Sequence, residues 1–218
     1  MGNYLSRFGP YHCWSCKEKD IITQDRLDAL EEIVNSLRRN VRVLGHGWVF
    51  RGEGVANQGV VNEIVTAIES GCPRAVRSLL DAGWRLEAAQ ALYIFLTRLE
   101  QPLIPTSIQS LVLDNNNRNV PPEVVASDVL GLIREELSLR HRTLIALILN
   151  LLDCSIKLSP ADELRGHTLP VSMLPQFFNI ENHHFMEEWR RILIIFVELI
   201  RQASTALTVS RSHSENLR

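Results

Sequence analysis

The chain has 218 residues, of which 45% are hydrophobic and 22% charged, with 11 glycines and 9 prolines. These proportions are typical of a globular protein and exclude collagen-like, low-complexity and wholly disordered classes. The 23 basic and 25 acidic residues give a formal net charge of −2, so no overall charge attracts the chain to nucleic acid. Four cysteines in a chain of this length do not form a disulfide framework, and we expect a reducing, cytoplasmic location.

The first predicted helix begins at Thr23 or Asp25, since either side chain is a suitable helix cap. Its apolar residues recur at spacings of three and four, which predicts one buried face: Leu27, Leu30, Ile33, Val34 and Leu37. The segment from Asn40 to Gly54 breaks this period and contains four glycines. We therefore expect a loop here, partly buried by its aromatic residues.

The rest of the chain continues the helical pattern, with glycine and proline at the expected helix ends. Further helices are predicted over residues 60–70, 74–82, 86–99, 121–137, 143–156 and 183–207. Loops are expected over residues 114–122 and 158–182. No run of alternating residues predicts a strand, so the fold class is all-α. We expect one helical domain over residues 21–208, an N-terminal segment before it and a disordered polar tail over 209–218.

The N-terminus carries a possible membrane signal. No apolar stretch approaches the roughly 20 residues of a spanning helix, but the first six residues fit the pattern for N-myristoylation at Gly2. One myristoyl chain binds a bilayer only marginally, and Cys13 and Cys16 are close enough to Gly2 to add palmitoyl groups. This predicts a peripheral position at the inner face of a membrane. The alternative is coincidence, because many soluble proteins begin with Met-Gly.

The pair Cys13 and Cys16 also fits half of a zinc site. A structural zinc ion needs four ligands, usually from two such pairs. Cys72 and Cys154 stand alone in the sequence, so we expect no metal. The chain also has no nucleophile elbow, no phosphate-binding loop and no dinucleotide fingerprint after a strand. We therefore expect no cofactor and no free-standing enzyme chemistry.

A family resemblance begins in the glycine-rich loop, which reads Gly47-Trp48-Val49-Phe50-Arg51-Gly52-Glu53-Gly54. It resembles the arginine-finger loop of RhoGAP domains, which activate GTP hydrolysis by Rho-family small GTPases. Three further blocks resemble later segments of that family in the same order: Leu92 to Pro105, Arg142 to Leu152 and Leu169 to Pro175. Together the blocks span about residues 21–208. The resemblance implies a RhoGAP-like helical bundle whose partner is a Rho-family GTPase.

The resemblance also implies roles for individual residues. Arg51 takes the place of the catalytic finger. Tyr93 and Thr97 stand where the family has a Lys that supports the finger loop and an Arg that meets the GTPase. Arg98 lies next to Thr97, and Thr168 stands where the family has an Asn that contacts the GTPase.

Several of these positions depart from the family pattern. Tyr93 keeps the length of the expected Lys but not its charge, and Thr97 keeps neither the length nor the charge of the expected Arg. Glu100 replaces a proline of the family signature. Leu174 replaces the glycine that precedes the family proline matched by Pro175. Two function classes therefore stay open. The chain is a GTPase activator, or it is a non-catalytic interaction module on the same fold, in which Arg51 is structural.

Overall fold

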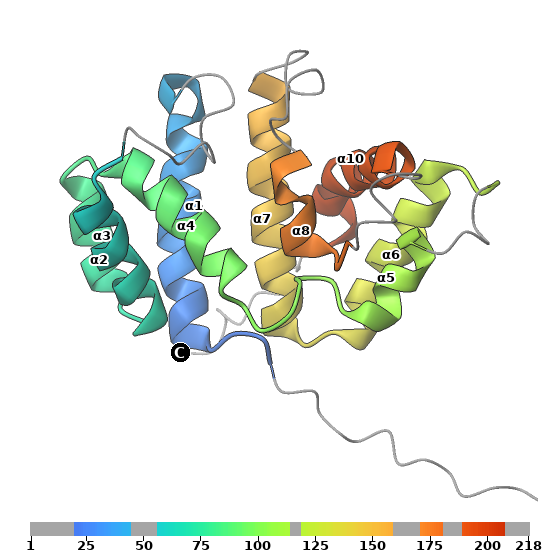
Figure 1. Ribbon diagram of the computed structural model, residues 1–218, viewed down its shortest axis with the longest axis horizontal. Coiled ribbons are helices and arrows are strands. Elements are labelled where there is room, and N and C mark those ends of the chain that lie inside the picture. Colours follow the sequence, from blue (N-terminus) through green and yellow to red (C-terminus); the bar gives the residue numbers. More distant parts are fainter. Residues whose placement is uncertain (1–19, 45–55, 114–118, 159–170, 181–188, 208–218) are drawn as a thin grey trace, which may run out of the picture.

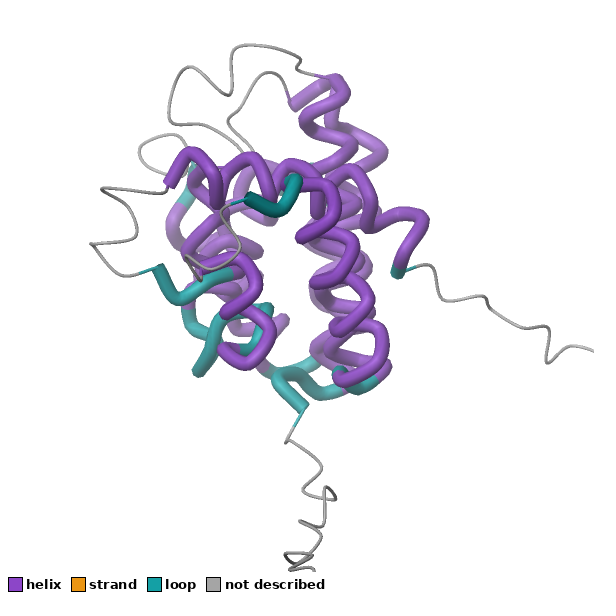
Figure 2. Tube along the Cα trace, turned by 90° about the vertical axis from the view of Figure 1, so that its right-hand side faces the viewer, coloured by secondary structure: helices purple, strands orange, loops and turns teal. Residues whose placement is uncertain are grey.

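The computed structural model describes residues 20–44, 56–113, 119–158, 171–180 and 189–207. Within these ranges every regular element is helical, and no strand is present (Figure 2). The all-α prediction is confirmed for this part of the chain. The tail that we expect to be disordered, residues 209–218, lies outside the described residues, so this expectation stays a prediction.

The first half of the described chain is a group of helices around a long central one. Its elements are α1 (Gln24–Leu44), α2 (Gln58–Glu69), α3 (Pro73–Asp81) and α4 (Arg85–Thr97). The carbonyl of Thr23 accepts the first hydrogen bond of α1, from Leu27 N at 3.0 Å. The apolar stripe of α1 is fully buried, as predicted, because α2, α3 and α4 all pack against this helix.

The second half adds a further layer of helices. Its elements are α5 (Thr106–Leu113), α6 (Pro122–Glu136), α7 (Leu139–Leu158), the 3-10 turn η2 (Val171–Met173), α8 (Leu174–Phe177) and α10 (Trp189–Ala206). Helix α10 packs on α6 and α7, and α7 packs on α1. Figure 1 shows α1 and α7 side by side in the middle of the molecule, where they join the two halves.

Three sequence-based predictions need correction. The expected loop from Asn40 does not begin there, because α1 continues to Leu44 and only Gly45 offers a helix breaker. Asn40 lies within the helix, where its Nδ2 donates to the carbonyl of Ser36 one turn earlier, at 2.7 Å. Helix α5 was not predicted at all. The predicted irregular segment 158–182 contains the end of α7 as well as η2 and α8.

Gly71 sets how closely α2 approaches α1. Its φ of 64° lies in the left-handed region, and a Cβ at this position would lie 2.6 Å from Asp25 Cβ. Beside it, Arg26 Nε on α1 donates to the carbonyl of Glu69 at 2.8 Å. The glycine is therefore required both for the turn and for the contact between the two helices.

We expect Gly71→Ala to lower the free energy of unfolding by about 1–3 kcal/mol, because alanine strains the turn and meets Asp25. Gly131→Ala is a suitable control: Gly131 lies inside α6 and a Cβ there meets nothing within 4 Å. This control should stabilise the protein by up to about 1 kcal/mol, because alanine favours helix. Urea unfolding of both variants measures the difference. Equal shifts in the two variants would contradict the role given to Gly71.

Candidate functional site

The segment that contains Arg51 lies outside the described residues, but the helices at both of its ends are described. Helix α1 ends at Leu44 before it, and Asn57 caps α2 after it. The Asn57 side chain accepts hydrogen bonds from two amides in the first turn of α2, at 3.0 and 3.4 Å. The backbone N of Asn57 donates to Glu87 Oε1 at 3.1 Å. The chain that follows Arg51 is thus fixed to the first turn of α4.

Glu87 is suited to this anchoring role because it is only 7% exposed. A buried amide–carboxylate hydrogen bond is stronger than an exposed one, and leaving either group unpaired is costly. Sequence reasoning did not find this pair. Asn57 before a helical period is a cap signal, but nothing in the local pattern around Glu87 indicates a partner 30 residues earlier.

Chain lengths set which residues Arg51 is able to reach. Arg51 precedes Asn57 by six residues, and an extended chain of that length spans at most about 20 Å. On α4, Tyr93 lies six residues beyond Glu87 and Thr97 lies ten, which corresponds to about 9 Å and 15 Å along the helix axis. The length of the chain between Asn57 and Arg51 therefore does not exclude a position of Arg51 beside either residue.

Tyr93 and Thr97 are one helical turn apart on α4, so they share a face of this helix. Tyr93 is partly buried and packs against the hydrophobic core. Thr97 is exposed, and its hydroxyl donates to the carbonyl of Ile94 at 2.7 Å. The Thr97 hydroxyl thus binds its own helix, and neither residue supplies the positive charge that the family resemblance leads one to expect.

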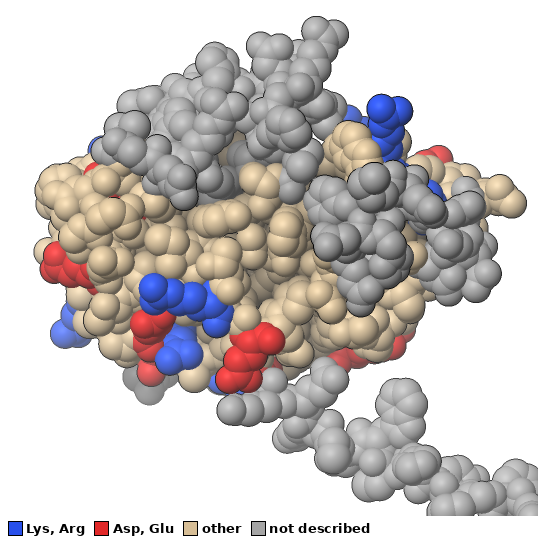
Figure 3. All heavy atoms as spheres, in the orientation of Figure 1, with Lys and Arg blue, Asp and Glu red and all other residues tan. Residues whose placement is uncertain are grey.

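Arg98 lies at the other end of α4 from Glu87, about 16 Å along the helix. Its Nη1 is 2.9 Å from Glu69 Oε1, so it links α4 to the end of α2. Charged side chains gather at this end of the molecule (Figure 3). A pocket of about 690 Å³ lies there, lined by Arg26 and by residues 20–23 and 98–101. Both partners of the Arg98–Glu69 pair are exposed, which makes its contribution to stability small.

The segment Leu92 to Pro105 contacts residues that directly border two other blocks of the family resemblance. The segment after α4 runs beside α8, with Leu103 N donating to the carbonyl of Gln176 at 2.8 Å and Ile104 N to that of Phe177 at 3.2 Å. From α7, His141 Nε2 lies 2.7 Å from the carbonyl oxygen of Leu103. The loop after α4, the start of α7 and α8 therefore form one packed region.

The remaining predicted site residues lie outside the described part of the chain. These are Gly2, Cys13, Cys16 and Thr168, whose roles stay predictions. Among the described residues, no three His, Cys, Asp or Glu side chains are grouped so as to hold a metal ion. None of the described helices combines the length and the apolar character needed to cross a membrane.

Comparison of this chain with family models, curated proteins and solved structures gives no match.

Proposed function

We propose that this chain is a RhoGAP-like module that stimulates GTP hydrolysis by a Rho-family small GTPase. In this proposal Arg51 enters the partner's nucleotide site and stabilises the charge on the transferring phosphate. A guanidinium suits this task because it is planar, always charged and able to bridge two oxygens. The GTP is bound by the partner, so the chain needs no substrate pocket of its own.

One observation above all supports the proposal, namely the hydrogen bond from Asn57 N to buried Glu87. It attaches the end of the Arg51 segment to the helix that carries Tyr93 and Thr97. Catalysis by an inserted arginine depends on placing it accurately, and an error of 1 Å costs up to about 100-fold in rate. A fixed attachment beside the proposed contact helix meets part of this requirement.

A different observation favours the alternative of a non-catalytic interaction module. The Thr97 hydroxyl binds within α4 and Arg98 is paired with Glu69, while Tyr93 carries no charge. The face of α4 that the resemblance assigns to the GTPase thus lacks the two cations of that family. Such a module would bind a GTPase without accelerating hydrolysis.

Glu87→Ala separates anchoring from binding. We expect this change to slow stimulated hydrolysis by about 10- to 100-fold, because the Arg51 segment loses its fixed end. Affinity for the GTPase should change little, since the Glu87 side chain is buried and therefore not exposed to a partner protein. Single-turnover GTP hydrolysis gives the rate, and titration of the GTPase gives the affinity.

Glu63→Ala, which removes an exposed carboxylate from α2, is the matched control and should leave both quantities unchanged. Glu87→Gln keeps an acceptor oxygen for Asn57 N and should retain most of the activity. A Glu87→Ala protein that is folded and fully active would show that the anchor has no part in catalysis.

A further inference from the structure

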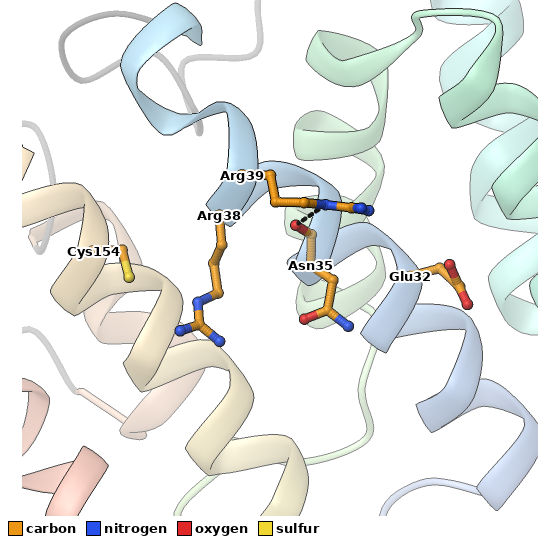
Figure 4. Close-up of a pocket in the computed structure, with 5 residues that line it drawn as sticks. All are labelled: Glu32, Asn35, Arg38, Arg39 and Cys154. Atoms are coloured by element: carbon orange, nitrogen blue, oxygen red, sulfur yellow. Dashed lines mark hydrogen bonds between the residues drawn. The ribbon is translucent and has the colours of Figure 1, made fainter.

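A second pocket, of about 540 Å³, is lined mainly by α1 with one residue from α7, and its lining includes none of the described residues assigned to the proposed GTPase site (Figure 4). Four of its lining residues lie on one face of α1, and the fifth comes from α7: Glu32, Asn35, Arg38, Arg39 and Cys154. The α1 residues share a face because spacings of three and four residues correspond to one helical turn. Sequence analysis assigned no role to this group.

Glu32 is shared between two arginines, since Arg77 binds it and the charge of Arg39 also acts on it. Arg77 Nε donates to Glu32 Oε2 at 3.2 Å, and Arg77 Nη2 donates to Glu32 Oε1. The hydrogen bond from Arg77, assisted by the charge of Arg39, lowers the pKa of Glu32, so the carboxylate stays charged. With Arg77 also bound to Glu32, this one carboxylate is outnumbered, and Arg38 and Arg39 leave an excess of positive charge at the pocket.

The two arginines and Asn35 offer hydrogen-bond donors to the pocket. Arg38 makes no hydrogen bond or ion pair with any other described residue, and its guanidinium extends in the same direction as the Asn35 amide (Figure 4). Arg39 is held by its Nε, which donates to the carbonyl of Asn35 at 3.2 Å. Its terminal nitrogens point toward the Glu32 side of the pocket, away from Arg38 (Figure 4), and make no hydrogen bond with another described residue.

We propose that this pocket binds a phosphate monoester, with Arg38 and Asn35 as donors and Arg39 supplying further charge. A monoester carries about −1.5 to −2 charges at neutral pH, which matches the excess positive charge at the pocket better than the single charge of a carboxylate does. Guanidinium groups also bind phosphate oxygens in a bidentate manner. The pocket is wide open to solvent, so the organic group of the ester has room beside the phosphate. The monoester is either a free metabolite-sized molecule or a lipid headgroup.

The alkylation rate of Cys154 provides a direct readout of ligand binding, because Cys154 lines this pocket. The exposed thiol of Cys72 does not line it and serves as an internal reference. The full chain is alkylated with iodoacetamide, and each cysteine is followed separately by peptide mass spectrometry. We expect glycerol 3-phosphate to slow alkylation of Cys154 but not of Cys72, relative to chloride at the same ionic strength. Phosphatidylcholine vesicles with and without phosphatidylinositol 4-phosphate form the lipid arm. Protection by the soluble ester indicates a free ligand, and protection only by the phosphoinositide vesicles indicates a headgroup.

Arg38→Gln should raise the concentration needed for protection by about tenfold or more, since a charge-assisted hydrogen bond is lost. Arg74→Gln is the matched control, because it also removes one exposed arginine, on α3, and should have no effect. Equal protection of Cys154 and Cys72, equal effects of the two substitutions, or protection by neither probe would overturn the proposal.

Discussion

Arg51→Ala should abolish nearly all stimulation of GTP hydrolysis while leaving affinity for the GTPase almost intact. The guanidinium acts mainly on charge that develops in the transition state, so its loss affects the rate more than ground-state binding. Arginine fingers typically contribute about 10³ to 10⁵ in rate. Arg51→Lys should restore only part of the activity, because an ammonium group lacks the planar fork of a guanidinium.

Single-turnover hydrolysis by a GTP-loaded GTPase measures this effect, with Arg74→Ala as the matched loss of an exposed arginine outside the proposed site. The double change Tyr93→Lys and Thr97→Arg should raise the rate, because it restores the two charges that the family resemblance leads one to expect. If the wild-type chain binds a GTPase without accelerating its hydrolysis, and Arg51→Ala changes neither the rate nor the affinity, Arg51 is structural and the interaction-module alternative holds.

Phe196→Ala should have the largest effect on stability. Phe196 is fully buried on α10, with its ring centroid 4.8 Å from that of Phe177 and 5.8 Å from that of Phe178. Truncation leaves a cavity between α10 and α8 and should lower the free energy of unfolding by about 3–5 kcal/mol. Ile194→Ala, at a side chain on the same helix that is 52% exposed, should cost less than about 1 kcal/mol.

Urea unfolding followed by circular dichroism gives both free energies. A Phe196→Ala protein as stable as the Ile194→Ala protein would contradict the packing described for α10. That packing matters for the site because the same aromatic cluster includes Phe177, whose carbonyl accepts the hydrogen bond from Ile104 N after α4.

The helices whose ends carry strong local signals could be predicted from the sequence. Helices α2 and α3 are each followed, two residues after their last residue, by a glycine with positive φ, Gly71 and Gly83, and α3 and α6 begin with proline. The end of α1 was placed too early because the polar residues after Leu37 interrupt the apolar period without breaking the helix. The short helices α5 and α8 were missed because their length gives too few turns for a clear period.

The candidate site was predictable only in part. The spacing of apolar residues correctly placed Tyr93 and Thr97 on one helix, because a helical period is visible in residues that are close in sequence. The pairs Glu87–Asn57 and Arg98–Glu69 join residues 30 and 29 positions apart, and only the packing of α2 on α4 brings them together. Local spacing carries no information about such contacts, so the anchor of the Arg51 segment emerged only from the structure.

The most direct test of the central proposal is the wild-type rate. Each member of a panel of GTP-loaded Rho-family GTPases is mixed with a saturating excess of the full chain, and phosphate release is followed over one turnover. We expect faster hydrolysis by at least one GTPase, with modest stimulation because α4 lacks two of the family's charges. Binding to a GTPase with no change in its hydrolysis rate at saturation would contradict the proposed activity.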